Sequence, residues 1–519
     1  MPYRYQVLFC IMIGITMFLI DTTVVNVALA KLEAVFAVDV ATVQWAITAY
    51  ALASGIVTPM ADYFTVRFGM KRLWLVALTG FTAASIMGGL SPAFPVLIVA
   101  RILQGLSGGL LLPVGISTIF RAFPPDQRGL ALGLFAIPIV AGPALGPTVG
   151  GYIVTSLDWR LIFFLNLPIG ILSVIMGAAM LRDEREDREP ILDVWGAILA
   201  ATGFGTILFG LSRVADDGWT SLTVEGLVLF GVLCLFVLAV HELEVDHPLL
   251  EVRLFAIPQF LIGNIVGWTS TVALFGAEFL LPLYLQNLRG LSAFDTGLML
   301  LPQGLSIAVA GPIAGRLTDK IGVRTVAVFG FILLAINTWN LAHITLDTDY
   351  STLRLLLIIR GAALGCTMQS SQLVALASVP PRFLTNASSL NTAMRNVFQS
   401  FGVGILGVMV QTQTVAHTAA LSQQVTPTSE GGMFIQRAAA GIMQATPGIS
   451  AAAAQAQAQA IMLGQVVREA TVLAFGDAYR FTFFAALLAI VLSMFLPDRR
   501  PTGQVPAPAE SEEVMVVAH

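Results

Sequence analysis

The run VLFCIMIGITMFLIDTTVVNVAL (Val7–Leu29) decides the fold class of this chain. Asp21 is its one charged residue, and most of the rest is apolar. A helix needs roughly 20 mostly apolar residues to cross a bilayer, so the run predicts a membrane-spanning helix. It is too long for the core of a signal peptide and has no small-residue cleavage site, so we expect the helix to be retained.

Runs of the same kind recur along all 519 residues. We therefore predict an all-α integral membrane protein with fourteen spans, at about 7–29, 43–62, 72–91, 96–120, 130–153, 161–181, 193–213, 223–241, 260–286, 296–315, 325–346, 353–377, 388–412 and 478–496. Because the side that would hold the N-terminus carries about twice as many Lys and Arg residues as the other side, we expect both termini in the cytoplasm.

The composition excludes several classes of protein. Only 11% of the residues are charged and 56% are hydrophobic, whereas soluble proteins are about 25% charged. The net charge of −4 and the lack of a basic block exclude a nucleic-acid binder. No GxxxxGK[ST] motif supports an ATP-driven pump. Cys10, Cys234 and Cys366 lie in apolar runs without metal or disulfide spacing, so we expect no metal and no cofactor.

Two stretches between the spans are polar. Residues 182–190 (RDEREDREP) form a charged connector on the cytoplasmic side. Residues 413–475 form a long external loop, in which Ala451–Ala460 (AAAAQAQAQA) predicts a helix because alanine and glutamine are good helix formers. A spacer and a docking arm for a partner both remain open for this loop.

Two segments indicate an internal duplication. PMADYFTVRFGMKRL (Pro59–Leu73) follows the second span, and GPIAGRLTDKIGVRT (Gly311–Thr325) follows the tenth. VARILQG (Val99–Gly105) and IIRGAALG (Ile358–Gly365) repeat at nearly the same offset. Such repeats are common in transporters. We expect a six-helix bundle at 1–181, a linker with two inserted helices at 182–257, a second bundle at 258–497 and a tail at 498–519.

Several motifs carry a resemblance to a known family. They are LIDTTVVNVALA (Leu19–Ala30), VQWAITAYAL (Val43–Leu52), ARILQGLSGGLLLP (Ala100–Pro113), GPALGPTVGGYI (Gly142–Ile153), WRLIFFLNLPIG (Trp159–Gly170) and GRLTDKIGVR (Gly315–Arg324). With them the chain resembles the major facilitator superfamily, and within it the fourteen-span drug:proton antiporters of the EmrB and QacA type. The external loop is more similar to the EmrB side.

The resemblance implies a function as well as a fold. It implies a multi-pass protein of the bacterial cytoplasmic membrane, not an enzyme, that exports hydrophobic drugs or toxic compounds in exchange for protons by alternating access. It also makes a periplasmic adaptor of the membrane-fusion type a candidate partner. An exporter of one metabolite (a siderophore, lipid or antibiotic), a proton-coupled importer and a non-transporting scaffold are the alternatives.

The resemblance implies a gate at the duplicated loop. The second copy is intact and comprises Gly315, Asp319, Lys320, Gly322 and Arg324. The first copy, with Asp62, Arg67 and Gly69, departs from the pattern, because Asp62 occupies the usual glycine position and Val66 the usual aspartate position. Either a charge network is rebuilt around Asp62, or only the second copy is a latch. Simple anchoring by Lys and Arg is the alternative to gating.

The fifth span resembles the antiporter motif of the superfamily. Gly142, Gly146 and Gly150 recur at every fourth position and give one smooth helix face, and the motif also includes Gly151. Pro143 and Pro147 predict kinks, because proline removes a backbone donor. The role that the resemblance implies is packing of the two halves against leak; ordinary helix packing rests on the same physics.

Four ionisable residues inside spans are the candidate site. A charge in mid-membrane is costly, so each asks for a partner or a hydrated cavity. Asp21, Arg101, Glu278 and Arg360 lie on spans 1, 4, 9 and 12, which line the central cavity in this superfamily. At ~1.5 Å per residue, the first three lie roughly 9–12 Å below the outer surface. We therefore expect Asp21, Arg101 and Glu278 to share one cavity.

We expect Asp21 and Glu278 to carry protons, since burial favours the neutral form of a carboxyl group. Arg101 would favour the ionised form in one conformation only, and Gln104 would add an uncharged hydrogen bond. Fixed structural ion pairs are the alternative. Aromatic and thioether side chains suit flat apolar substrates, so we expect cavity walls at Trp45, Tyr50, Phe275, Phe279, Tyr284 and Met368, together with Gln104 and Arg360.

Overall fold

The structure, a computed structural model, describes residues 2–183, 191–446 and 448–497, and within these ranges it contains helices but no strand. The chain is thus an all-α integral membrane protein, as predicted. Most of the connector expected at 182–190 and the whole tail at 498–519 lie outside the described residues.

The first half comprises the following helices: α1 (Tyr3–Phe36), α2 (Val40–Val43), α3 (Trp45–Val57), α4 (Ala61–Phe68), α5 (Met70–Gly89), α6 (Phe94–Ala122), α7 (Arg128–Ser156), α8 (Leu161–Phe164) and α9 (Asn166–Met180). Next come α10 (Val194–Asp217) and α11 (Leu222–Glu244). The second half comprises α12 (Pro258–Leu283), α13 (Ala293–Ile321), α14 (Val323–Leu341), α15 (Tyr350–Ala377), α16 (Leu384–Gln424), α17 (Glu430–Ala445) and α18 (Ala451–Ser493).

Each range expected to cross the membrane coincides with a helix or with consecutive helices. Within the described residues, ten helices are long and apolar enough to span a bilayer. The count of fourteen spans, the inside location of both termini and the domain limits stay predictions. The duplicated loops give tight joints: Gly69 (φ 82°) separates α4 from α5, and Gly322 (φ 99°) separates α13 from α14. Glycine adopts such positive φ angles without strain.

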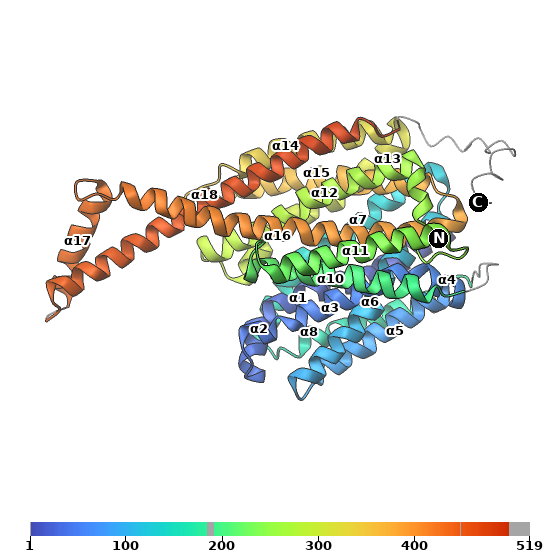
Figure 1. Cartoon of the computed structure of the whole chain (residues 1–519), viewed down its shortest axis with the longest axis horizontal. Helices are drawn as coiled ribbons and strands as arrows, with labels where there is room; N and C mark the ends of the chain where they lie inside the picture. Colours follow the sequence, from blue (N-terminus) through green and yellow to red (C-terminus); the bar gives the residue numbers. More distant parts are fainter. Residues whose placement is uncertain (1, 184–190, 447, 498–519) are drawn as a thin grey trace.

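The helices lie side by side along the long axis of the molecule, and α1 begins at the same end at which α18 finishes (Figure 1). At this end, which we call the terminal end, buried apolar side chains of both halves form one continuous core. At the opposite end the halves have separate cores, around Trp159 in the first half and Tyr479 in the second. The structure is therefore closed at the terminal end.

The region expected as an external loop is largely helical. α16 and α18 continue beyond the bundle at the end opposite the termini, and α17 joins them (Figure 1). The helix expected at Ala451–Ala460 is present as the first turns of α18. At ~1.5 Å per residue, the 41 residues of α16 span about 60 Å, twice the roughly 30 Å of a hydrocarbon core. We call residues 413–475 the external hairpin; most of it projects, but Val472 and Phe475 near its end belong to the core of the second half.

Candidate functional site

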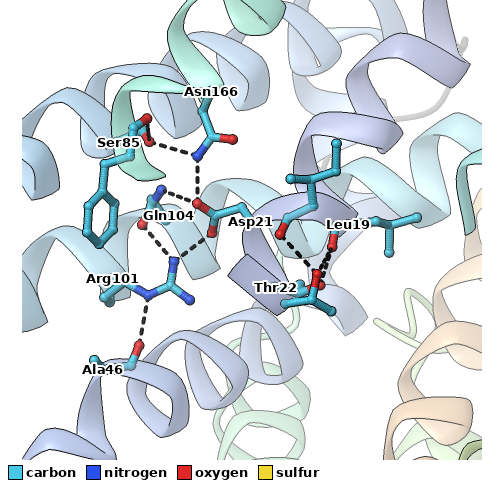
Figure 2. A network of polar contacts seen from close by, with 11 residues as sticks. Leu19, Asp21, Thr22, Ala46, Ser85, Arg101, Gln104 and Asn166 are labelled. Atoms are coloured by element: carbon cyan, nitrogen blue, oxygen red, sulfur yellow. Dashed lines mark hydrogen bonds and ion pairs between the residues drawn. The ribbon is translucent and has the colours of Figure 1, made fainter. Parts of the chain in front are cut away.

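Asp21 lies at the centre of a buried polar cluster in the first half (Figure 2). Arg101 Nη1 donates to Asp21 Oδ2 at 2.6 Å. Asn166 Nδ2 and Gln104 Nε2 donate to Asp21 Oδ1 at 2.6 and 3.1 Å. All four side chains are fully buried. The carboxylate is therefore held by one cation and two amides, out of contact with water in this conformation. We call this group the Asp21 cluster.

Helices α3 and α6 fix the guanidinium of Arg101. Its Nε donates to the carbonyl oxygen of Ala46 at 2.8 Å, and its Nη1 also donates to Gln104 Oε1, three residues along α6, at 2.9 Å. The guanidinium carbon lies 4.0 Å from the ring centroid of Tyr50, a cation–π contact. Arg101 Nη2 and the Tyr50 hydroxyl are buried without a hydrogen-bond partner. The cluster is thus tightly organised but incompletely satisfied.

Glu278 forms a corresponding cluster in the second half. Arg360 Nε lies 3.5 Å from Glu278 Oε2, and Gln303 Nε2 donates to both carboxylate oxygens at 2.9 Å. Arg360 Nη2 donates to the carbonyl oxygen of Leu274 at 3.2 Å. Glu278 is 29% exposed, whereas Arg360 and Gln303 are buried. Each half therefore pairs a carboxylate with an arginine and a glutamine, although the glutamines come from different places: Gln104 lies on the same helix as Arg101, whereas Gln303 lies on α13 and Arg360 on α15. We call this group the Glu278 cluster.

The expectation that Asp21, Arg101 and Glu278 share one cavity does not hold in this conformation. Asp21 and Arg101 are sealed in the first half, and Glu278 pairs with Arg360 in the second. Similar depth along parallel helices does not bring residues to the same side of a bundle, because depth says nothing of the direction in which each helix faces. Each carboxylate has its own arginine instead.

The intact gating motif joins the two halves at the terminal end. Asp319 of α13 accepts hydrogen bonds from the backbone N–H groups of Gly129 and Leu130, at 3.0 and 2.9 Å. These groups belong to the first turn of α7, where N–H groups lack partners within the helix and the helix dipole favours a negative charge. Gly315 allows the approach, because a Cβ there would lie 2.2 Å from the Gly129 carbonyl oxygen.

The other gating residues contribute differently. Arg324 Nε donates to the carbonyl oxygen of Leu496, just after α18, at 2.8 Å, and Lys320 is exposed. In the first copy Asp62 is buried on α4, which packs against α16, and Arg67 is exposed. The contact that corresponds to Asp319 has no aspartate, because Val66 takes that place.

In this conformation the glycine face of α7 packs within the first half, and the expected role of these residues in packing the two halves against leak stays a prediction. A Cβ on Gly142 would lie 2.6 Å from Leu19 Cβ, one on Gly146 would lie 1.9 Å from Thr23 Oγ1, and one on Gly150 would lie 2.7 Å from Val24 Cγ2. All three partners belong to α1. Gly151 is buried and Pro147 partly buried in α7, while the side chain of Pro143 lies outside the described part.

A different face of α7 meets the second half. Gly133 lies against Gly311 of α13, where an added Cβ would be 2.3 Å from the Gly311 carbonyl oxygen. Spacing of four residues identifies a smooth helix face, but α7 has two of them, and the sequence does not say which neighbour each one meets. α7 therefore contacts both α1 beside Asp21 and the Asp319 latch.

The expected cavity-wall residues have different surroundings. Tyr50 belongs to the Asp21 cluster, and Met368 lines a small pocket between α12, α15 and α16. Trp45 is 42% exposed and stacks on Phe209 of α10 with 5.6 Å between ring centroids. Tyr284 is buried, and its hydroxyl donates to the Thr345 carbonyl oxygen at 2.6 Å. The side chains of Phe275 and Phe279 lie outside the described part.

Two amide residues of the clusters, Asn166 and Gln303, were not predicted from the sequence. Asn166 binds Asp21 and also donates to Ser85 Oγ at 2.9 Å, and Gln303 binds Glu278. Asn166 stands inside the quoted run WRLIFFLNLPIG and Gln303 between apolar residues of the tenth span. An amide within an apolar run was the available signal, since a buried polar group needs a partner.

The fold and its buried charge pairs are those of a multi-pass membrane transporter. A family model described as the Major Facilitator Superfamily matches residues 11–403. Among solved structures, the proton:xylose symporter XylE superposes with a TM-score of 0.60 at 15% identity, covering 95% of this chain and 96% of that one. The human organic anion transporter MFSD10 gives 0.58 at 13%, covering 94% and 100%. These likenesses concern the fold alone.

Relatives identified by sequence similarity are also transporters and drug-resistance proteins. The uncharacterized MFS-type transporter YhcA of Bacillus subtilis is 29% identical over 98% of this chain and 97% of its own. The lincomycin resistance protein LmrB of the same species is 32% identical over 78% and 84%, and the multidrug export protein EmrB of Escherichia coli 31% over 79% and 80%. The chain belongs to the Major Facilitator Superfamily. It is a multi-pass protein of the bacterial cytoplasmic membrane, and its relatives support drug efflux in general.

Proposed function

We propose that this protein exports hydrophobic compounds in exchange for protons. The observation that carries the proposal is the fully buried pair of Asp21 and Arg101, with no water access in this conformation. Desolvating a pair of charges is costly, and removing the charge of one partner leaves the other uncompensated. A proton on Asp21 would therefore change the preferred conformation of the protein, which is what coupling between a proton and a cargo requires.

The proposed cycle starts from the closed terminal end. When Asp21 is ionised, it holds Arg101, and the Asp319 latch keeps α7 against α13. When Asp21 takes up a proton, its attraction for Arg101 falls, and hydration of the guanidinium becomes favourable. α7 contacts α1 at Leu19 and Thr23, on either side of Asp21, and its first turn is bound by Asp319. We propose that α7 carries the rearrangement from the cluster to the latch.

Glu278 supplies a second proton site in this proposal. It is partly exposed and pairs with Arg360 at 3.5 Å, a longer distance than the 2.6 Å of the Asp21 pair. A carboxylate that reaches water can exchange its proton in this conformation, whereas the sealed Asp21 takes up its proton through a transient local opening of the cluster and releases it after the terminal end opens. The two carboxylates would thus exchange their protons at different steps of one transport cycle.

The direct test uses purified protein in proteoliposomes. An imposed pH gradient should drive a fluorescent hydrophobic compound that the protein is shown to bind uphill against its own gradient, and a proton uncoupler should abolish this accumulation. Uphill movement that survives the uncoupler would contradict proton antiport. Liposomes with an equal pH on both sides provide the control for passive partition.

The external hairpin supports a second part of the proposal, a docking arm for a periplasmic adaptor. It stands clear of the bundle (Figure 1) and exposes large apolar side chains, which favours an interaction surface over a plain spacer. The exposed residues include Val415, Met433, Met443, Ile461 and Leu463.

A shortened hairpin tests the arm. Residues 425–466 are replaced by a short Gly/Ser linker, which keeps His417 and Asp477, whose side chains are 2.7 Å apart between α16 and α18. We expect drug resistance to fall in a double-membrane host while transport in proteoliposomes stays at the level of the parent protein. Full resistance in the host would show that the hairpin is a spacer.

A further inference from the structure

Arg395 of α16 is a third arginine inside the bundle, and its surroundings differ from those of Arg101 and Arg360. It lines a pocket between α12, α15 and α16, together with Trp268, Met368, Gln372 and Asn391. Arg101 and Arg360 each face a carboxylate. Among the residues that the structure describes, no carboxylate lies within ion-pair distance of Arg395, and none lines the pocket.

Three buried N–H donors of the pocket have no acceptor within hydrogen-bond distance in the described part of the chain. Arg395 Nε, Gln372 Nε2 and Trp268 Nε1 are all buried without a hydrogen-bond partner. Each is an N–H donor, and the side chains of arginine and tryptophan accept no hydrogen bond. A buried donor without a partner destabilises a protein by roughly 1–3 kcal/mol. Three such donors in one pocket therefore lower the stability of the fold unless a ligand binds them. The missing component is an acceptor, and beside an arginine a negatively charged one fits best.

Neighbouring polar groups do not supply that acceptor. Asn391 Nδ2 donates to Asn264 Oδ1 at 2.7 Å, and the Thr271 hydroxyl donates to the Gly267 carbonyl oxygen at 2.8 Å. Both hydrogen bonds are internal to the pocket wall. Among the described residues, none of the three donors has a hydrogen-bond partner.

We propose that this pocket is the subsite for the carboxylate of an amphipathic aromatic substrate. The assignment rests on the proposed function, and it specifies the class of cargo. The planar guanidinium of Arg395 matches the two oxygens of a carboxylate, with Gln372 and Trp268 as further donors. An aromatic platform adjoins them, since Trp268 stacks on Phe398 with 5.1 Å between centroids and 13° between planes. Met368 adds an adaptable apolar wall.

The position of the pocket suits loading from the terminal end. Arg395 lies eleven residues after the start of α16 and Trp268 ten residues after the start of α12, about 15 Å along each helix from that end. The cavity volume is only about 30 Å³, room for a water molecule or two. A drug-sized anion therefore enters when the terminal end opens.

The pocket also adjoins the Glu278 cluster. Leu274 lines the pocket, and its carbonyl oxygen accepts the hydrogen bond from Arg360 Nη2. One turn of α12 separates Leu274 from Glu278. An anion held at Arg395 thus lies beside the proton site of the second half, where its charge would influence whether Glu278 keeps a proton.

The test measures binding, so it does not depend on proton coupling. The full-length protein in phosphatidylcholine nanodiscs is titrated with 9-anthracenecarboxylate and with its methyl ester, and energy transfer from tryptophan to anthracene reports binding. The variants are Arg395→Gln, Arg395→Lys and, as a matched control, Arg354→Gln at an exposed position of α15. A parallel series contains phosphatidylglycerol, to detect an anionic lipid in the pocket.

We expect Arg395→Gln to weaken carboxylate binding on the order of tenfold to a hundredfold, with ester binding changed less than threefold. Arg395→Lys should restore part of the affinity, and Arg354→Gln should behave as the parent. Thermal unfolding without ligand should show Arg395→Gln folded and at least as stable as the parent, because it removes a charge that lacks a counter-ion. Equal loss for acid and ester would indicate a structural role and overturn the proposal.

Unchanged carboxylate binding in Arg395→Gln would also overturn it, and so would loss of the Arg395 effect in the phosphatidylglycerol series, which would assign the pocket to lipid. Carboxylate binding that depends on Arg395, combined with a failure of uphill export in the pH-gradient assay, would leave the subsite standing and refute the proton-driven function instead.

Discussion

At the scale of single residues, amide side chains as well as arginines bind the carboxylate of each cluster. Asn166 Nδ2 donates to Asp21 at 2.6 Å and Gln303 Nε2 donates to Glu278 at 2.9 Å. An amide holds a carboxylate in place without cancelling its charge, so the carboxylate keeps the ability to take up a proton. The arginine compensates the charge of the carboxylate and the amide fixes its position, which explains why each cluster contains both kinds of donor.

The amide at Asn166 is open to a simple test. Asn166→Ala removes one donor from the buried carboxylate, and we expect it to lower the free energy of unfolding by about 1–3 kcal/mol. Thermal unfolding in detergent measures the change. Ser173→Ala on the same helix is the control, since Ser173 is buried and its hydroxyl has no partner. If both variants melt at the same temperature, Asn166 does not stabilise the cluster.

Glu251, in the loop between α11 and α12, makes the stability of the fold depend on pH in a direction that can be predicted. Burial raises the pKa of its carboxyl group above the usual value of 4.5, against the opposing effect of Arg253. A raised pKa means that the fold favours the protonated form. The contribution to stability is present below pH 4.5 and is lost as pH rises through the raised pKa.

We therefore expect Glu251→Gln to raise the melting temperature at pH 8 and to leave it nearly unchanged at pH 4. Melting curves across this range make the comparison, with Glu244→Gln at an exposed position of α11 as the control. A variant that melts below the parent at pH 8 would show that the charged form of Glu251 stabilises the fold.

At the scale of elements, α7 is the helix on which the account depends. Its first turn is bound by Asp319 of α13, and its glycine face packs on α1 next to Asp21. The closed terminal end should be sensitive to both contacts.

Asp319→Ala removes the acceptor at the start of α7. Loss of such a contact costs about 0.5–2 kcal/mol, which shifts the population of the closed state by roughly 2- to 30-fold. Spin labels at positions 127 and 320 would report a longer distance between the halves. Asp126→Ala, at an exposed position in the adjacent turn, is the control. An unchanged distance distribution in Asp319→Ala would exclude a latch.

Gly133→Ala tests the same interface through packing. Its Cβ would lie 2.3 Å from the Gly311 carbonyl oxygen, so the halves must separate to accept it. We expect the same lengthening between the spin labels, with Gly226→Ala, where nothing lies within 4 Å, as the control. A label distance equal to that of the control would show that the two helices adapt without opening.

The sequence predicted the helices well, because each span is a long apolar run, and it singled out Asp21 and Arg101, which the structure pairs, because a charge inside such a run stands out. It did not predict which residues meet. Asn166 reaches Asp21 from a helix far along the chain, and the direction in which each helix faces depends on packing with its neighbours. The α7 glycines show the same limit, since their spacing defines a face and not its partner.

At the scale of the whole molecule, the structure has one closed end and one projecting hairpin. The helices of both halves share a core at the terminal end, and the external hairpin stands at the other (Figure 1). Export requires that the terminal end face the cytoplasm, since cargo is loaded there.

The orientation can be measured by labelling intact cells with a membrane-impermeant maleimide. We expect Gly441→Cys in α17 to react in intact cells, and Asp126→Cys in the turn before α7 to react only after lysis. Labelling of position 126 in intact cells would place the terminal end outside and reverse the proposed direction of transport.

The most direct measurement of the central claim is substrate-driven proton movement in proteoliposomes that contain the parent protein, Asp21→Asn or Asp246→Asn, the last at an exposed loop position. The account predicts proton movement for the parent and for Asp246→Asn, and none for Asp21→Asn, which should still exchange substrate down its gradient. Proton movement per substrate at the parental level in Asp21→Asn would contradict it.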